Sequence, residues 1–173
     1  GRELLSFKGI GELEASVTSG GLSTMPWTFE KQLRTLENKT LRYKGHWDEM
    51  AAFRQLGLFS RLPIKIGDIK CIPRDFYHAL LEPQIDSGRV PDVCIMRTEA
   101  HGIKDNKEMI AQINCIEYFD EVTKFSAMEK WTGWHASIMC IKIAKGKCKS
   151  GAISVENALT GKEFKKEGEK RGY

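Results

Sequence analysis

The sequence predicts an α+β fold, in which helices pack on one face of a largely antiparallel, mixed sheet. Two observations favour this fold class. Segments with strand-like alternation and segments with helical spacing are both present, but they lack the regular strand–helix–strand order that builds a parallel sheet. The two clearest strands, residues 93–100 and 109–119, are joined by a polar segment with Gly102, Asp105 and Asn106, which indicates an antiparallel hairpin.

Length and composition are those of a globular protein. The 173 residues suffice for one domain, or one domain and a fragment of another, and such a chain buries roughly 70% of its unfolded surface. The net charge of +4 is interspersed with acidic residues and forms no basic stripe, which argues against a nucleic-acid partner. No signal peptide is present, and no apolar run is long enough to span a bilayer, so we expect no membrane partner.

The five cysteines are widely separated, and no Cys-x-x-Cys pair occurs. This pattern favours neither a zinc site nor a disulfide framework, so we expect no metal and a reducing, cytoplasmic location. Cys94 and Cys115 lie in apolar runs and are predicted to be small core residues.

The first elements are strands followed by a helix. Residues 3–17 alternate as a strand that is interrupted at Gly9–Gly11. Residues 22–27 are predicted to form a tight loop or short turn, residues 31–43 a further strand, and residues 45–56 a helix that stops at Gly57. The expected inward positions of the first segment are Leu5, Phe7, Leu13, Ala15 and Val17.

The later helices have clear start and stop signals. Pro73 suits the first position of a helix over residues 73–86, although Pro83 could end it early. Ser126 and Glu129 have the spacing of a capping box and open the strongest helix, which should run to about Lys145 and stop at Gly146. A short charged helix is expected over residues 162–170.

Polar donors gather at the end of the predicted strand 31–43. Lys39, Thr40, Arg42 and Tyr43 lie on the strand, and His46 follows the break at Gly45. Donors at a strand end can hold a small anionic molecule, although solvent-facing polar residues would give the same pattern. The basic residues from Lys142 to Lys149 are most simply a solvated helix end, with a polyanion site as the alternative.

Several common catalytic motifs are absent. The sequence has no Gly-x-Gly-x-x-Gly after a strand, no phosphate loop and no His-Glu-x-x-His. The histidines have no metal-ligand spacing, and Ser137 lacks the context of a nucleophile elbow. Gly133 lies inside the strongest helix, where glycine is about 1 kcal/mol less favourable than alanine, so something is expected to approach it closely.

Three phrases together resemble the catalytic domain of the saccharopine dehydrogenase family, particularly its lysine 6-dehydrogenase branch. They are Glu14-Ala-Ser-Val-Thr-Ser-Gly-Gly-Leu-Ser-Thr-Met-Pro26, Lys39-Thr-Leu-Arg-Tyr-Lys-Gly-His-Trp47 and Ala127-Met-Glu-Lys-Trp-Thr-Gly-Trp134. A Leu56-Gly-Leu-Phe59 turn after the second phrase adds to the resemblance, which covers nearly the whole chain.

The resemblance implies a nicotinamide-dependent dehydrogenase of amino-acid metabolism that acts on lysine, saccharopine or a related amino acid. It implies that NAD or NADP is bound by a Rossmann domain absent from this chain, so that the chain alone is inactive. Residues 1–160 would form the substrate-binding and homodimerisation domain, incomplete at its N-terminus, and residues 161–173 a helix that packs on the Rossmann domain.

The resemblance also implies roles for individual residues. His46 and Tyr43 would be catalytic, with His46 as the base that takes a proton from the reacting amine. Two positions depart from the family's pattern, because Lys44 and His135 stand where proline is frequent. The implied substrate-binding residues are Arg42, which would hold a carboxylate, and Thr40, Thr24, Thr132 and Gly133.

Two alternatives to the enzyme remain open. A non-enzymatic α+β binding or assembly module could have kept the scaffold without the chemistry, and an upstream Rossmann segment would decide against it. The weaker alternative is a polyanion binder, for which binding would depend steeply on salt concentration.

Overall fold

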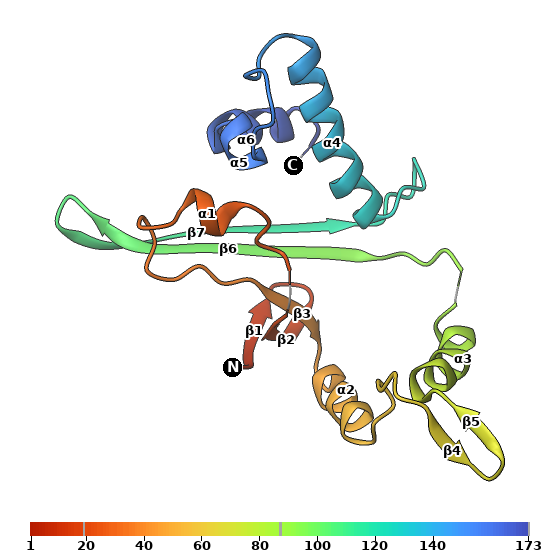
Figure 1. Ribbon diagram of the computed structural model, residues 1–173. Coiled ribbons are helices and arrows are strands. Elements are labelled where there is room, and N and C mark those ends of the chain that lie inside the picture. The colour runs from red at the N-terminus through yellow and green to blue at the C-terminus, as the bar shows by residue number, and fades with distance from the viewer. Residues whose placement is uncertain (19, 87, 173) are drawn as a thin grey trace. The chain divides into compact units, whose positions relative to one another are not determined.

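The computed structural model describes residues 1–18, 20–86 and 88–172, and the chain divides into two compact units, Gly1–Arg89 and Val90–Tyr173. Figure 1 shows the order of the elements along each unit. The predicted α+β class is confirmed, since helices accompany strands that all pair in antiparallel fashion within the described residues. These strands form three separate sheets of three, two and two strands.

A three-stranded sheet opens the first unit. Its order is β1-β2-β3, with bounds Glu3–Phe7, Gly11–Val17 and Lys39–Tyr43. Phe7, Leu13 and Ala15 are buried with exposed fractions of 2%, 4% and 0%, which confirms most of the predicted inward face. Val17 was expected to be buried but is 56% exposed, because it lies at the end of β2 opposite Lys39.

The strand predicted over residues 31–43 is shorter than expected. Only Lys39–Tyr43 forms β3, since the pairing with β2 ends at Val17 and the preceding residues have no strand to bond. Lys31 has φ +67°, which is incompatible with a continuous strand. The short turn expected over residues 22–27 contains the four-residue helix α1, Met25–Thr28.

The first unit ends with helices α2, His46–Gln55, and α3, Pro73–Ile85, as the sequence predicts. Pro83 does not end α3, which continues to Ile85. Sequence reasoning missed the three-residue strands β4, Ile64–Ile66, and β5, Ile69–Cys71.

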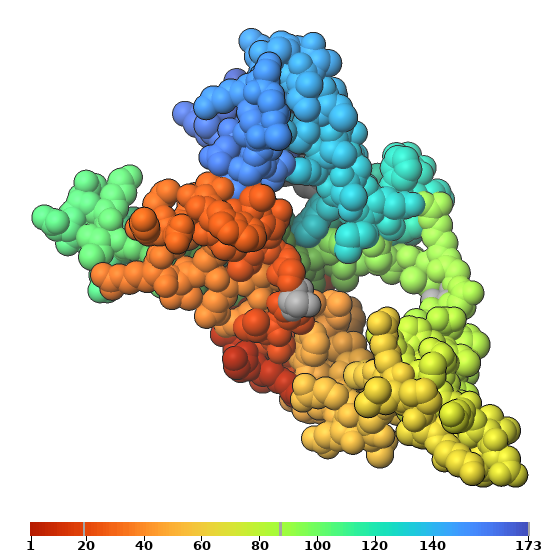
Figure 2. Space-filling model, viewed as in Figure 1, coloured from red at the N-terminus to blue at the C-terminus, as the bar shows by residue number. Residues whose placement is uncertain are grey.

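The second unit begins with a long two-stranded hairpin of β6, Val93–Lys104, and β7, Lys107–Tyr118. It is longer than predicted because Asp105 and Asn106, with φ of 53° and 56°, make a two-residue turn that lets the pairing reach the tip. Residues 98–114 are all exposed, and Figure 2 shows this tip as a green lobe beyond α4–α6.

Helix α4, Ala127–Ala144, begins with the predicted capping box, in which Ser126 Oγ accepts from Glu129 N at 3.0 Å. Asp92, the residue before β6, also caps the N-terminus of α4. Its carboxylate accepts hydrogen bonds from the backbone N–H groups of Ala127 and Met128 at 2.6 and 3.0 Å.

Within the described residues, α4 and the other helices lack the combination of length and apolar character needed to cross a membrane.

Helices α5, Val155–Ala158, and α6, Gly161–Glu169, complete the unit. Helix α6 matches the predicted charged helix, and it packs on α4. The Lys142 Nζ and Glu167 Oε1 atoms lie 3.4 Å apart, and the ring centroids of His135 and Phe164 are separated by 5.3 Å.

Acid is expected to loosen α6 from α4. Lys170, Arg171 and Lys142 lower the pKa of Glu167 from 4.5 to about 2. A carboxyl with a lowered folded-state pKa stabilises the fold above its unfolded-state pKa, and this stabilisation disappears as the pH falls from 4.5 to about 2. Amide hydrogen exchange of α6 should therefore accelerate across this window, and Glu167→Gln should show fast exchange already at neutral pH. An α6 exchange rate in Glu167→Gln equal to that of the unmodified chain at neutral pH would contradict the role of this carboxylate.

Candidate functional site

Strand pairing places two sequence phrases side by side. In the register of β2 and β3, Glu14 lies opposite Arg42 and Ser16 lies opposite Thr40. Residues directly opposite one another in an antiparallel pair project from the same face of the sheet. Thr40 and Arg42 therefore share a polar face with residues of β2, which is the face opposite Leu13 and the buried apolar side chains.

Hydrogen bonds and ion pairs distinguish the donors of β3, of which Thr40 lies on the polar face and Lys39 on the opposite one. Thr40 Oγ1 lies 2.6 Å from Thr18 Oγ1, so the two hydroxyls are bonded to each other. Lys39 Nζ lies 2.9 Å from Glu3 and 3.3 Å from Glu37, and both carboxylates raise the pKa of Lys39. Its charge is thus compensated locally.

The positive charge of Arg42 is not compensated by a neighbouring carboxylate in the part of the chain that the structure describes. Its Nη1 donates to the Leu41 carbonyl oxygen at 2.8 Å, the residue is exposed, and no carboxylate within the described residues pairs with it. A guanidinium in this state can form a forked pair with an incoming carboxylate.

Tyr43 does not join Thr40 and Arg42. It lies opposite Leu13 on the other face of the sheet and is 67% exposed. This separation follows from strand alternation, which sends neighbouring side chains to opposite faces.

His46 is the first residue of α2, immediately after Gly45, whose φ of +98° makes the turn out of β3. The half-buried imidazole contacts Trp47 edge-on at 5.1 Å between ring centroids. Trp47 Nε1 donates to the Glu14 carbonyl oxygen at 3.4 Å, which anchors the start of α2 to β2.

Thr24 precedes α1 and is exposed, and its carbonyl oxygen accepts from Thr28 N at 3.2 Å. Its loop passes close to the start of β3 at Gly21. A Cβ added to Gly21 would stand 2.3 Å from Asn38 Nδ2. Gly21, three residues before Thr24, therefore lies against the side chain of Asn38, the residue that precedes β3.

Thr132 and Gly133 lie in α4 of the second unit, and both are exposed. The close approach expected at Gly133 is not made by the described residues, because a Cβ there would meet open space within 4 Å.

A buried ion pair in the second unit escaped sequence reasoning. Lys130 in α4 and Glu117 in β7 are bonded to each other, with exposed side-chain fractions of 6% and 19%. Lys130 Nζ also lies 5.8 Å from the centre of the Trp134 ring. Next to this pair, burial and then the charges of Asp92 and Glu117 raise the pKa of the Cys94 thiol. The spacing of Lys130 and Trp134, four residues apart on a helix, indicates that these two side chains meet but does not identify Glu117 as the partner.

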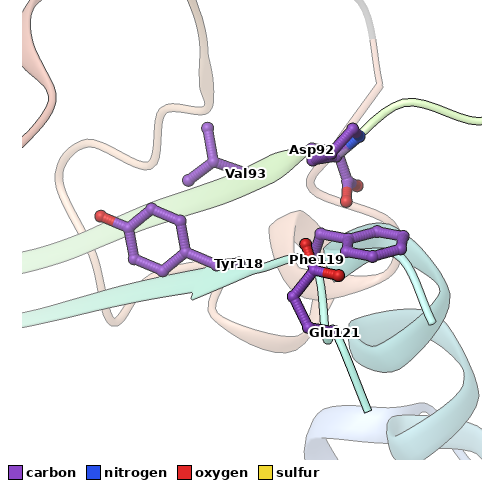
Figure 3. A pocket seen from close by; sticks show the side chains of 6 residues that line it. Asp92, Val93, Tyr118, Phe119 and Glu121 are labelled. Atoms are coloured by element: carbon purple, nitrogen blue, oxygen red, sulfur yellow. The ribbon is translucent and has the colours of Figure 1, made fainter. Parts of the chain in front are cut away.

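A shallow pocket of about 380 Å³ lies at the base of the hairpin, where Figure 3 shows its lining side chains. None of the predicted site residues lines it, and the Asp92 carboxylate is already bound to the start of α4. In the part of the chain that the structure describes, no cluster of His, Cys, Asp or Glu has the geometry to hold a metal ion. The pocket is lined by Pro91, Asp92, Val93, Tyr118, Phe119 and Glu121.

The chain matches a known protein family over nearly its whole length. The family model described as the saccharopine dehydrogenase C-terminal domain matches residues 3–172. The match spans both compact units, and thus all seven predicted site residues.

Proposed function

The chain belongs to the saccharopine dehydrogenase C-terminal domain family, and on this premise we propose that it is the substrate-binding and dimerisation half of a nicotinamide-dependent dehydrogenase. Its substrate would be lysine, saccharopine or a related amino acid, oxidised at a carbon that bears an amine. The observation that carries the proposal is the uncompensated Arg42 guanidinium beside Thr40 on the polar face of the first sheet.

The described residues of this chain do not have the features of a nicotinamide dinucleotide site. The described strands pair only in antiparallel fashion, and they provide no glycine-rich turn from a parallel strand into a helix. We assign the binding of NAD or NADP to a Rossmann domain outside this chain.

The residues of this chain would then act on the substrate. Arg42 would hold a carboxylate in a forked pair, and Thr40 and Thr24 would orient the same end of the molecule. The reacting amine must be neutral before it is oxidised, and His46 would take its proton, because histidine readily exchanges protons near neutral pH. Tyr43 projects from the other face of the sheet, so we do not assign it to the group of side chains that holds the carboxylate.

The dimerisation part of the proposal draws support from the hairpin. Met96, Met109 and Ile113 project from one face of β6–β7 and are 47%, 53% and 61% exposed. A two-stranded hairpin with an open apolar face is marginally stable alone and marks an interaction surface. We propose a second copy of the chain as its partner, and a monomer mass by light scattering would contradict this.

Arg42→Ala in the enzyme that contains this domain is expected to lower kcat/KM by about 10- to 150-fold. This corresponds to the loss of a charged hydrogen bond of about 1.5–3 kcal/mol. Steady-state kinetics with lysine and saccharopine would measure the change, and Arg42→Lys should recover part of it because one cationic donor remains.

The matched control for this test is Arg54→Ala. Arg54 is an exposed arginine in the last turn of α2, and its loss should leave kcat/KM within twofold. An unaltered kcat/KM in Arg42→Ala would refute the carboxylate role.

A further inference from the structure

Glu14 is a buried carboxylate with an unmet need for a hydrogen-bond donor. We infer that it binds the α-ammonium group of the amino-acid substrate whose carboxylate Arg42 holds. The inference rests on the proposed function and extends it from a carboxylate site to a site for the zwitterionic head of an α-amino acid.

The burial of Glu14 is the first observation. The residue is 9% exposed, and its Oε2 atom is buried without a hydrogen-bond partner in the part of the chain that the structure describes. An ionised carboxylate that is buried and unpaired is unfavourable, so such a group normally has a cationic or hydrogen-bonding partner in the functional state.

The neighbours of Glu14 in the first unit do not meet this need. Across the sheet on one side lies Leu4, which has no side-chain donor. Trp47 Nε1 donates to the backbone carbonyl of Glu14 and not to its carboxylate. On the other side lies Arg42, whose Nη1 donates to the Leu41 carbonyl oxygen instead.

The cross-strand geometry matches an α-amino acid. Directly opposite residues of an antiparallel pair have Cβ atoms about 4.5–5.5 Å apart. Glu14 and Arg42 therefore present opposite charges at neighbouring positions on one face, and an α-amino acid carries an ammonium and a carboxylate on a single carbon. If Arg42 is engaged by the substrate carboxylate, the α-ammonium lies beside Glu14 and can supply its missing donor.

This assignment gives Glu14 a part in specificity and not in proton transfer. The α-ammonium remains protonated throughout, while the amine at the reacting carbon of lysine is a different group that must lose its proton. Glu14 would thus favour α-amino acids over amines that carry only a carboxylate.

The test compares two ligands that differ only in the α-amino group, namely L-lysine and 6-aminohexanoate. Isothermal titration calorimetry of the enzyme that contains this domain should show tighter binding of L-lysine by about 10-fold or more, as expected for a charged hydrogen bond. Glu14→Gln should reduce the affinity for L-lysine to that for 6-aminohexanoate and leave the affinity for 6-aminohexanoate unchanged. Glu14→Asp, which keeps the charge, should retain part of the preference.

Controls separate this inference from a structural role and from the proposed function. Glu12→Gln removes an exposed carboxylate from the same face of β2 and should preserve the preference for L-lysine. Equal losses of both affinities in Glu14→Gln, or an undiminished preference for L-lysine, would overturn the inference and leave the role of Arg42 intact. Absence of binding of both ligands to the unmodified enzyme would overturn the proposed function as well.

Discussion

Replacing Lys130 by Met is expected to lower the free energy of unfolding of the second unit by about 3–5 kcal/mol, the usual result of breaking a buried ion pair. Lys130 and Glu117 are bonded where their side chains are 6% and 19% exposed. Methionine fills most of the lysine volume, so the loss would come from the carboxylate left behind and not from a cavity.

The cause lies in the position of the pair between the hairpin and α4. Glu117 is on β7 opposite Cys94, and Lys130 reaches it from the first turns of the helix. Once the ammonium is gone, Glu117 must be protonated, move into water, or remain charged in a poorly solvated place. Each of these outcomes weakens the packing of α4 on the hairpin.

Urea denaturation followed by tryptophan fluorescence measures the effect, since Trp134 lies beside Lys130. The double variant Lys130→Met and Glu117→Leu should recover most of the stability, because an apolar pair can replace a buried ion pair. Lys165→Met is the control, since Lys165 is 75% exposed and lies 3.6 Å from Glu169, and it should change the stability by less than about 1 kcal/mol. A loss in Lys130→Met no larger than in this control would show that the pair contributes little.

Local signals in the sequence predicted the elements well. The Ser126 capping box, the stop at Gly146 and the turn near Asp105 are all confirmed, because each is decided by residues within a few positions of one another. The strand predicted over residues 31–43 was too long, because its extent depends on where its partner β2 ends. The short β4–β5 hairpin was missed, because three residues per strand give too little alternation to detect.

In the candidate site too, features set by neighbouring residues could be predicted, and features set by distant residues could not. We expected Thr40, Arg42 and Tyr43 to form one cluster, but strand alternation places Tyr43 on the face opposite the other two. The burial of Glu14 could not be predicted, because it depends on the strands paired on both sides of β2. The Glu117–Lys130 pair joins a strand to a helix, and no local pattern links the two residues.

Gly21→Ala is expected to destabilise the first unit by about 2–5 kcal/mol, from backbone strain and overpacking together. Gly21 has φ +83°, a conformation that side chains with a Cβ rarely adopt, and its added Cβ would stand 2.3 Å from Asn38 Nδ2 and 2.7 Å from Asn38 Cγ. The atoms that the added Cβ would meet all belong to the Asn38 side chain, so either this side chain must change rotamer or the loop at Gly21 must shift.

Gly20 provides a matched control that separates the two causes. It also has φ +83°, but a Cβ there would meet nothing within 4 Å, so Gly20→Ala should show the strain alone, about 1–2 kcal/mol. The difference between the two variants in urea denaturation measures the clash, and Asn38→Ala in the Gly21→Ala background should remove most of that difference. Equal losses at both glycines would mean that Asn38 moves aside freely. The approach of Gly21 to Asn38 would then not fix this loop against the start of β3.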